Sequence, residues 1–226
     1  MVQGIKSDTA QVGDATSITL TSIIPVIERR SLVADKRHLR TQMRNRRRQL
    51  SQNEQQSAAD GLLRQISRLS YFRNVHRVAF YYPNDGEIDP RPTIEHAWRI
   101  GKQCFLPVVN HPNSPLRFAR YLRQQPTRLN RFGIPEPVVR RRDLRNAHNL
   151  QLILVPLVAF DANGGRLGMG AGFYDRTLAF LGSRKYWRSP MVIGTAHSFQ
   201  QVAHVPQDSW DVCLGGVVTE KAFLAV

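Results

Sequence analysis

The sequence predicts an α/β fold in which helices cover both faces of a mostly parallel sheet. Short runs rich in β-branched and aromatic residues alternate with amphipathic helical segments, and several of these runs are continuously apolar. At 226 residues, the chain is long enough for one large α/β domain with a buried core. We therefore expect a single domain over residues 32–226, preceded by a disordered extension over residues 1–31.

The chain begins with the extension and two predicted helices. Residues 1–28 are rich in Ser, Thr, Gly and Asp and have no sustained periodicity, which is typical of a poorly ordered segment. Residues 32–50 combine arginines with an apolar stripe at helical spacing, which predicts an amphipathic helix. Ser51 and Glu54 form a capping box that starts a second helix. The two apolar stripes consist of Leu39, Met43 and Leu50, and of Leu62, Leu63, Ile66 and Leu69.

Strands and helices alternate along the rest of the chain. The predicted strands are residues 75–82, 104–109, 116–122, 150–160, 191–196 and 214–219. After the first strand, Asp89 caps a helix that has Pro90 in its first turn and ends at Gly101. Residues 173–181 form a further helix. Residues 128–149 contain two prolines and no period, which predicts a long surface loop.

The net charge of +15 comes from two arginine-rich segments. Residues 29–48 hold nine basic side chains and one acidic side chain, and residues 117–145 hold nine arginines and two acidic side chains. The rest of the chain has 14 basic and 14 acidic residues and is therefore neutral. The planar fork of arginine suits phosphate and carboxylate ligands. The surplus therefore indicates either a nucleic-acid-binding protein or an enzyme with polyanionic substrates.

The cysteine and hydropathy patterns favour a reducing, aqueous compartment. Cys104 and Cys213 are far apart and form no CxxC pair, so neither a zinc site nor a redox motif is indicated. No apolar run approaches the roughly 18 residues of a membrane span. Basic residues follow the apolar residues 18–26 instead of preceding them, which argues against a secretory signal. We therefore expect a cytoplasmic protein without membrane contact.

The strongest chemical signal is a glycine-rich segment, residues 161–176, between an apolar strand and a helix. Its glycines, at positions 164, 165, 168, 170 and 172, can turn backbone N–H groups toward an anion, and the following helix N-terminus adds partial positive charge. Arg166 can hold phosphates, and Asp175 can hold Mg²⁺ together with them. The segment has neither Walker A nor GxGxxG spacing. The alternative is a flexible hairpin without a ligand.

Two further pairs of residues are candidates for ligand binding. Lys36 and Arg40 lie four residues apart, so one helix face can present both to a triphosphate. The alternative for this pair is a solvated basic face. Tyr82 and Glu87 follow a predicted strand, at the sheet edge where ligands of open α/β folds bind.

Other polar residues have simpler explanations. Turn chemistry accounts for Asp85 and Gly86, and helix capping accounts for Asp89. His197 is best interpreted as a buried histidine with a hydrogen-bond partner, and Asp211 as a turn residue or a second metal ligand beside Asp175. Because no Ser/His/Asp or Cys/His set is recognisable, a protein nucleophile is not indicated.

In order and spacing, several of these segments resemble the 5-formyltetrahydrofolate cyclo-ligase family, also called 5,10-methenyltetrahydrofolate synthetases. The matching segments are Lys36–Arg40, Tyr82 with Glu87, Leu106–Val109, Val155–Asp161, Arg166–Arg176 and Asp211–Thr219. The resemblance runs from about Val33 to the C-terminus, and the glycine loop is its most specific part. Where many relatives have a lysine in this loop, the chain has Ala171, so Arg166 or Arg176 is expected to supply the charge.

The resemblance implies a three-layer α/β/α fold and an ATP- and Mg²⁺-dependent reaction. The reaction closes 5-formyltetrahydrofolate to 5,10-methenyltetrahydrofolate and releases ADP and phosphate. The formyl oxygen attacks the γ-phosphate, and N10 then attacks the activated carbon and expels phosphate. Polyglutamylated forms of the folate are included among the expected substrates, and the protein is expected to be a monomer.

The resemblance also assigns roles to individual residues. It implies that ATP is bound by Lys36, Arg37, His38, Leu39, Arg40, Arg166, Leu167, Gly168, Met169, Gly170, Ala171, Gly172, Phe173 and Tyr174. It implies that the folate is bound by Tyr82, Glu87, Met169, Gly170, Ala171, Gly172 and Phe173, and Mg²⁺ by Asp175 and Asp211. The residues with an implied catalytic role are Lys36, Arg40 and Arg166.

Two other functions fit parts of the sequence less well. A nucleic-acid-binding protein should interleave aromatic and basic residues, whereas residues 29–48 contain no aromatic residue. Neither basic segment accounts for the glycine loop. A sugar-phosphate isomerase or CoA-transferase-like enzyme would also bind anions, but it would not need ATP. We therefore favour the cyclo-ligase function and expect no nucleic-acid partner.

Overall fold

The computed structural model describes Met1 and residues 35–182, 190–206, 212 and 214–226. The chain divides into two units, Met1–Asp35 and Lys36–Val226, and the fold below is that of the second unit. Apart from Met1, the expected N-terminal extension lies outside the described residues, as does the start of the helix predicted from residue 32. Residues 35–48 of that helix are helical, and we call them the basic helix.

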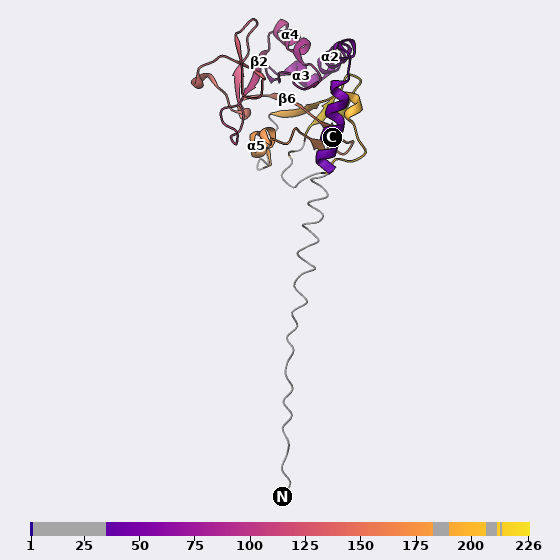
Figure 1. The fold of residues 1–226 in the computed structure, drawn as a ribbon. Coiled ribbons are helices and arrows are strands. Elements are labelled where there is room, and N and C mark those ends of the chain that lie inside the picture. The colour runs from indigo at the N-terminus through magenta and orange to yellow at the C-terminus, as the bar shows by residue number, and fades with distance from the viewer. Residues whose placement is uncertain (2–34, 183–189, 207–211, 213) are drawn as a thin grey trace. The chain divides into compact units, whose positions relative to one another are not determined.

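A sheet lies at the centre of this unit (Figure 1). In the described part of the chain it has seven strands, in the order β11-β10-β9-β6-β1-β2-β3. Its strands are β1 (Arg77–Ala79), β2 (Gln103–Val108), β3 (Arg117–Arg120), β6 (Leu152–Pro156), β9 (Met191–Thr195), β10 (Gly216–Val218) and β11 (Phe223–Ala225). The inner strands pair in parallel, while β3 and β11 pair antiparallel at the two edges. The predicted mostly parallel sheet is confirmed; β11 is an edge strand that the sequence analysis did not include.

Side chains on the two faces of the sheet enter two different cores. The helices of one layer are α2 (Gln52–Arg68), α3 (Ser70–Asn74) and α4 (Arg91–Arg99). On that face Val78 of β1 packs in one hydrophobic cluster with Leu62 of α2 and Ile94 of α4. The next residue, Ala79, enters a second cluster with Leu178 of α5 (Phe173–Leu178). Because side chains alternate along a strand, both faces are covered, which confirms the three-layer fold.

Helix ends form at or next to the residues that the sequence predicts. The Ser51 hydroxyl accepts the Glu54 N–H at 3.3 Å, and the Glu54 carboxylate accepts the Ser51 N–H at 2.8 Å, so the capping box is present. Asp89 accepts the N–H of Arg91, the first residue of α4, at 2.8 Å. Gly101 follows the helix with a φ of +76°, a conformation that favours glycine. Gly101 therefore ends α4 as expected, but the predicted start is wrong by one residue: Pro90 is the N-cap residue and not part of the first turn, and Asp89 bonds from the position before the cap.

The segment predicted as a long loop, residues 128–149, contains ordered elements. These are β4 (Thr127–Leu129), β5 (Pro135–Pro137) and the 3₁₀ helices η1 (Arg141–Asp143) and η2 (Ala147–Asn149). Asn130 closes the hairpin because its side-chain oxygen accepts the N–H groups of Phe132 and Ile134 at 2.9 and 3.1 Å. Two prolines fit in β5 because it belongs to a separate two-stranded sheet, where strand positions without an N–H are tolerated.

The long apolar run predicted as one strand is divided at Pro156. Its first part is β6, and its second part, β7 (Ala159–Phe160), pairs with β8 (Arg166–Leu167) in a separate hairpin. The predicted helix over 173–181 is α5 followed by the 3₁₀ helix η3 (Ala179–Leu181), and a further 3₁₀ helix, η4 (Ser198–Gln200), follows β9.

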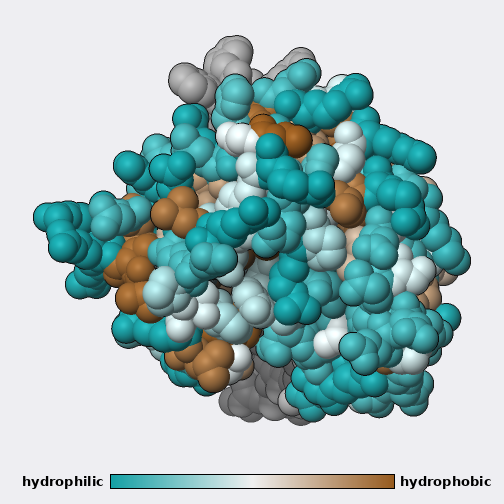
Figure 2. Space-filling model, turned by 90° about the horizontal axis from the view of Figure 1, so that it is seen from above, coloured by the Kyte–Doolittle hydropathy of each residue, from teal (hydrophilic) through white to brown (hydrophobic). Residues whose placement is uncertain are grey.

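The surface is mostly polar on the side that Figure 2 shows, where apolar side chains form small separate groups. Among the described residues, no helix combines the length and apolar character needed to cross a membrane.

Candidate active site

A cleft of about 420 Å³ opens at the carboxyl ends of the central strands. Tyr81 and Tyr82 line it after β1, Val109 lines it after β2, and Pro156 lines it at the end of β6. Parallel strands end at the same edge of a sheet, so the connections that leave them converge there. The cleft therefore lies at the edge where the sequence analysis expects a ligand.

The basic helix presents two of its cations to this cleft. Lys36 and Arg40 both line it, because residues four apart share a helix face. The Arg40 Nε donates to the Gly168 carbonyl oxygen at 2.9 Å. The intervening residues do not line the cleft: Arg37 and His38 are exposed, and Leu39 packs in a small hydrophobic cluster. The structure therefore brings only the two ends of the predicted Lys36–Arg40 motif to the candidate site.

The glycine-rich segment has two structurally different halves. In the first, Asp161 forms the turn of the β7–β8 hairpin, because its Oδ1 accepts the N–H groups of Asn163 and Gly165 at 2.9 and 2.8 Å. The hairpin interpretation thus describes this half. In the second, every residue from Leu167 to Asp175 lines the cleft. Gly170 and Gly172 have φ values of +96° and +66°, so only this half combines glycine conformations with cleft position.

Arg166 and Asp175 form an ion pair in the cleft. The Arg166 Nη2 lies 2.5 Å from the Asp175 Oδ1, and the Arg166 Nε donates to the Val212 carbonyl oxygen at 2.9 Å. Only 8% of Arg166 is exposed, so its guanidinium is held in a fixed orientation. Arg176 donates to the Ala171 carbonyl oxygen at 2.8 Å.

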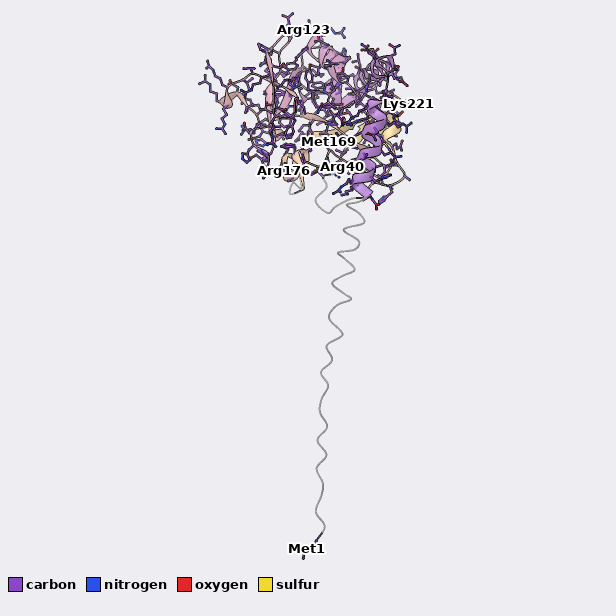
Figure 3. The ribbon with its side chains drawn as sticks, viewed as in Figure 1. Met1, Arg40, Arg123, Met169, Arg176 and Lys221 are labelled. Carbon is purple, nitrogen blue, oxygen red and sulfur yellow. The ribbon has the colours of Figure 1, made fainter. Side chains whose placement is uncertain are left out.

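Arginines from two helices, Arg40 of the basic helix and Arg176 of α5, thus bond to carbonyl oxygens of the glycine loop. In Figure 3, Arg40, Met169 and Arg176 lie on the same side of the domain. The positive charge that a lysine at position 171 would bring is therefore available near this loop from Arg176.

Glu87 and Tyr82 occupy the cleft wall that follows β1. The Glu87 carboxylate accepts the Asn84 N–H at 3.1 Å. Burial raises the pKa of Glu87 to about 7, although the positive charge of Arg47 opposes this shift. Burial, with a smaller contribution from the charge of Glu87, also raises the pKa of Tyr174 above its usual range. The cleft therefore holds one carboxyl group that titrates near neutral pH beside a neutral phenol.

The β4–β5 hairpin contributes site residues that the sequence analysis missed. Asn130, Phe132, Ile134 and Glu136 all line the cleft. The buried Glu136 carboxylate accepts the Val109 N–H at 2.9 Å and the Asn130 side-chain amide at 2.8 Å, which fixes the hairpin to β2. The Phe132 ring packs edge-on against Phe173 at 5.8 Å. A surface loop without a period gives no sequence signal for this contact.

Potential metal ligands are few in this cleft. Within the described ranges, no group of three or more His, Cys, Asp or Glu side chains could hold a metal ion. Asp211 lies outside the described residues, so Asp175 is the predicted metal ligand that can be placed. Mg²⁺ commonly binds through one or two carboxylates together with substrate phosphates. The half-buried Asp175 carboxylate therefore fits an ion carried by a nucleotide.

His197 lies beneath the β1–α4 loop, outside the cleft lining. Its Nε2 donates to the Gly86 carbonyl oxygen at 3.1 Å, and its ring stacks on Phe199 at 5.2 Å. Burial lowers the pKa of His197, so the neutral ring is favoured. The interpretation of His197 as a buried, hydrogen-bonded histidine is confirmed.

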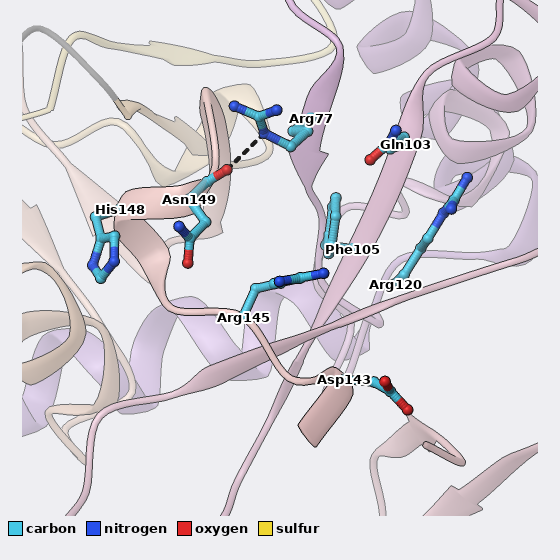
Figure 4. Close-up of a pocket in the computed structure, with 8 residues that line it drawn as sticks. All are labelled: Arg77, Gln103, Phe105, Arg120, Asp143, Arg145, His148 and Asn149. Carbon is cyan, nitrogen blue, oxygen red and sulfur yellow. Dashed lines mark hydrogen bonds between the residues drawn. The ribbon is translucent and has the colours of Figure 1, made fainter. Parts of the chain in front are cut away.

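A second hollow, of about 620 Å³, lies at the amino ends of the strands (Figure 4). We call it the arginine groove; its lining residues are Arg77, Gln103, Phe105, Arg120, Asp143, Arg145, His148 and Asn149. Arg77 donates to the Asn149 carbonyl oxygen at 2.7 Å, as the dashed line in Figure 4 shows. Arg120 and Arg145 come from the second basic segment, so part of the charge surplus lies at the sheet edge opposite the cleft.

Comparisons with known proteins agree with this geometry. Residues 32–220 match the model of the 5-formyltetrahydrofolate cyclo-ligase family. The 5-formyltetrahydrofolate cyclo-ligase of Escherichia coli (strain K12) is 40% identical over 179 residues, which are 78% of this chain and 96% of that protein. The protein of the same name from Haemophilus influenzae is 36% identical over 181 residues, 79% of this chain and 94% of that protein. The structure of the Aquifex aeolicus 5,10-methenyltetrahydrofolate synthetase superposes with a TM-score of 0.71 and 32% identity, covering 84% of this chain and 92% of that chain.

Proposed function

The chain belongs to the 5-formyltetrahydrofolate cyclo-ligase family, and we propose that it closes 5-formyltetrahydrofolate to 5,10-methenyltetrahydrofolate with conversion of ATP to ADP and phosphate. The observation that carries this proposal is the convergence of two kinds of group in one cleft. Lys36, Arg40 and Arg166 meet the glycine loop there, and Glu87 lies in the wall of the same cleft. Cations suit the phosphates, and a carboxylate suits the ring N–H groups of a pterin.

The nucleotide is proposed to bind between the basic helix and the glycine loop. Lys36 and Arg40 contact its phosphates, and the backbone of residues 168–172 follows its outline. Arg40 is already oriented by its hydrogen bond to Gly168, so little side-chain freedom is lost on binding. A pre-oriented arginine stabilises developing phosphate charge more effectively than a mobile one.

The folate is proposed to bind against the wall formed by Tyr82, Glu87 and Phe173. The ionised Glu87 accepts hydrogen bonds from the pterin ring, and the aromatic side chains pack against its faces. Phe132 covers the same part of the cleft from the β4–β5 hairpin. This arrangement holds the formyl group toward the nucleotide and limits access of water.

The reaction needs no protein nucleophile. The formyl oxygen of the substrate forms a bond to the γ-phosphorus while the bond from that phosphorus to ADP breaks. N10 then bonds to the formyl carbon and loses its proton, and the bond from this carbon to the phosphate oxygen breaks. Positioning and charge neutralisation dominate such a phosphoryl transfer, which is what the arginine-lined cleft can supply.

Arg166 and Asp175 are proposed to act together at the phosphates. Arg166 neutralises charge that develops on the transferred phosphoryl group, and Asp175 fixes the Arg166 guanidinium through their ion pair. Asp175 would also hold Mg²⁺, with Asp211 as a second candidate ligand. When bound, this ion would neutralise charge on the nucleotide phosphates.

Absorbance of the methenyl product in the near ultraviolet tests the proposal directly. The purified chain with 5-formyltetrahydrofolate, Mg²⁺ and ATP should develop this band, and omission of ATP should prevent it. Lys36→Ala should lower turnover by about 100-fold or more. Arg64→Ala removes one positive charge from an exposed position on α2 and should leave turnover unchanged. Lack of a band with all components present, combined with tight RNA binding, would favour the nucleic-acid alternative instead.

A further inference from the structure

One carboxylate, that of Asp85, binds three arginines of the basic helix. Its Oδ2 accepts Arg44 Nε at 2.5 Å and Arg47 Nη2 at 3.2 Å, and its Oδ1 accepts Arg48 Nε at 2.5 Å. The three arginines stand at positions i, i+3 and i+4, so they share one helix face. Asp85 belongs to the loop between β1 and α4, which also carries Glu87.

The β1–α4 loop packs closely on the basic helix at this point. Asp85 has a φ of +53°, a conformation that aspartate tolerates better than most residues. At Gly86, a Cβ atom would lie 2.9 Å from the Arg47 carbonyl oxygen, so the two backbones leave no room for a side chain. Gln55 donates to the Gly86 carbonyl oxygen at 3.3 Å from the neighbouring helix α2. Turn chemistry accounts for this backbone, but it does not explain three ion pairs on one carboxylate.

Arg47, the most buried of the three arginines, depends most on the negative charge of Asp85. Arg47 is 0% exposed, and a guanidinium buried to this degree needs a compensating charge. Its Nη1 donates to the Leu157 carbonyl oxygen at 3.4 Å, and its Nη2 lies 3.9 Å from the Met169 Sδ of the glycine loop. Burial raises the pKa of Asp85, but the hydrogen bonds from Arg44 and Arg48 outweigh this and hold it below its usual range. Asp85 is therefore ionised at neutral pH.

The residues of the basic helix that line the cleft lie at its N-terminal end, away from the three arginines that bind Asp85. Arg40 and Lys36 line the cleft about one and two turns before Arg44, respectively, and a Cβ at Gly170 would lie 3.3 Å from the Arg40 Cζ. A rotation or shift of this helix moves both cations relative to the glycine loop. Glu87 is held separately, because its carboxylate and its N–H both bond to the backbone of Asn84, at 3.1 and 3.0 Å.

We propose that Asp85 is a positioning residue, which fixes the basic helix against the β1–α4 loop so that Lys36 and Arg40 face the nucleotide phosphates. This inference rests on the proposed function of the cleft. Asp85 does not line the cleft in which both substrates are proposed to bind. It acts through the helix, and its loss should affect the two substrates unequally.

Initial rates of the full chain, measured separately against ATP and against 5-formyltetrahydrofolate, test the proposal. Asp85→Asn keeps the size of the side chain and removes the charge, so the three arginines repel one another and the helix moves. We expect the KM for ATP to rise at least about tenfold, since displacements near 1 Å can have still larger kinetic effects. The KM for the folate should change less than about threefold, because Asn84 still holds Glu87.

Asp89→Asn is the matched control. Asp89 lies in the same loop and has the same charge, but it pairs with Arg91 of α4 at 2.6 Å and not with the basic helix. This variant should keep the wild-type KM for ATP. A general loss of stability, by contrast, would lower the rates with ATP and with the folate by the same factor. Thermal denaturation of the same samples would reveal such a loss as a lowered midpoint.

A second variant covers the case in which Asp85→Asn does not fold. Arg44→Gln combined with Arg48→Gln removes the two more exposed partners and keeps the buried Arg47–Asp85 pair. It should raise the KM for ATP in the same direction by a smaller factor. An active wild-type chain with an unchanged KM for ATP in the folded variants would overturn the positioning role alone. A wild-type chain that makes no methenyl product would overturn the proposed function and, with it, this inference.

Discussion

The two hollows at opposite edges of the sheet both contain arginines, but they hold them differently. In the cleft, Arg40 bonds to the Gly168 carbonyl oxygen and Arg166 pairs with Asp175. In the arginine groove, Arg120 and Arg145 are exposed, and no acidic side chain in the described ranges pairs with them. Asp143 lines the groove without forming an ion pair with a described residue.

This difference shows that the number of arginines in a segment does not indicate which arginine acts at the proposed phosphate site. Arg166 lies outside both basic segments of the sequence, in the part of the chain where acidic and basic residues balance. It is nevertheless held by two contacts, one to the Val212 carbonyl oxygen and one to the Asp175 carboxylate. An oriented guanidinium can stabilise charge that develops at one point, whereas an exposed one mainly contributes to the long-range field. We therefore expect substitutions in the two hollows to affect different steps.

The largest effect is expected when one arginine in each hollow is replaced by alanine and the two variants are compared. Arg166→Ala should lower kcat/KM by about 100-fold or more, because it removes a pre-oriented charge at the proposed phosphate site. Arg120→Ala should change kcat/KM at physiological salt by less than about twofold, since exposed substitutions away from a site have small effects. Steady-state rates and circular dichroism of both variants provide the measurement. Equal losses in the two variants would remove the distinction between the hollows.

The titration of Glu87 gives the next largest effect. Because its pKa is raised to about 7, the carboxylate that accepts pterin N–H groups forms only as the pH rises through neutrality. The kcat/KM for the folate should therefore increase about tenfold per pH unit below this pKa and level off above it. Glu87→Gln should abolish this inflection. A pH profile of the variant that still bends near neutrality would assign the titration to another group.

The same shift predicts how stability depends on pH. The folded state holds the Glu87 proton more tightly than the unfolded state does, so the stability contributed by the neutral form is present at acidic pH and is lost as the pH rises through about 7. Glu87→Gln cannot ionise. Its midpoint of thermal unfolding should therefore exceed that of the wild type by more at pH 8 than at pH 5. Asp143→Asn removes one exposed carboxylate from the arginine groove and serves as the control for the change in net charge.

Phe132 tests the covering hairpin with a smaller effect. It is 44% exposed and packs edge-on against Phe173, so its removal uncovers the proposed folate wall without opening the core. Phe132→Ala should raise the KM for the folate several-fold and change the free energy of unfolding by about 0.5 kcal/mol or less. Leu129→Ala is the control, because Leu129 lies on the same hairpin, is 69% exposed and does not line the cleft. Identical KM values in the two variants would exclude the hairpin from the substrate site.

Patterns with a local cause could be predicted from the sequence. The capping box at Ser51, the end of α4 at Gly101 and the alternation of strands and helices each depend on neighbouring residues, and each is present in the structure. Lys36 and Arg40 could be paired from their spacing alone, and they do share the cleft. The convergence of Glu87 at the same edge follows from the rule for parallel sheets.

Contacts between distant segments could not be predicted in this way. The sequence shows Asp85 as a turn residue, and its three arginine partners become visible only when the basic helix packs on the β1–α4 loop. Likewise, nothing in the sequence of residues 128–149 reveals that Phe132 reaches Phe173. Such contacts depend on loop paths, which carry no periodic signal. The glycine segment was predicted as one unit, but its first half serves a hairpin turn and only its second half lines the cleft.

The smallest expected effect concerns the arginine groove itself. If its charges attract ATP and anionic folates over a distance, kcat/KM should fall as salt rises, because the Debye length shrinks to about 3 Å at 1 M. Arg120→Gln combined with Arg145→Gln should then lower kcat/KM about twofold at low salt and have no effect at high salt. Arg64→Gln combined with Arg68→Gln on α2 removes the same charge elsewhere and separates the effect of position from that of net charge. Screening by salt weakens mainly long-range attraction between exposed charges. A decrease in kcat/KM that persists at high salt would therefore indicate that the groove contacts a substrate directly. The two hollows would then not differ in the way proposed here.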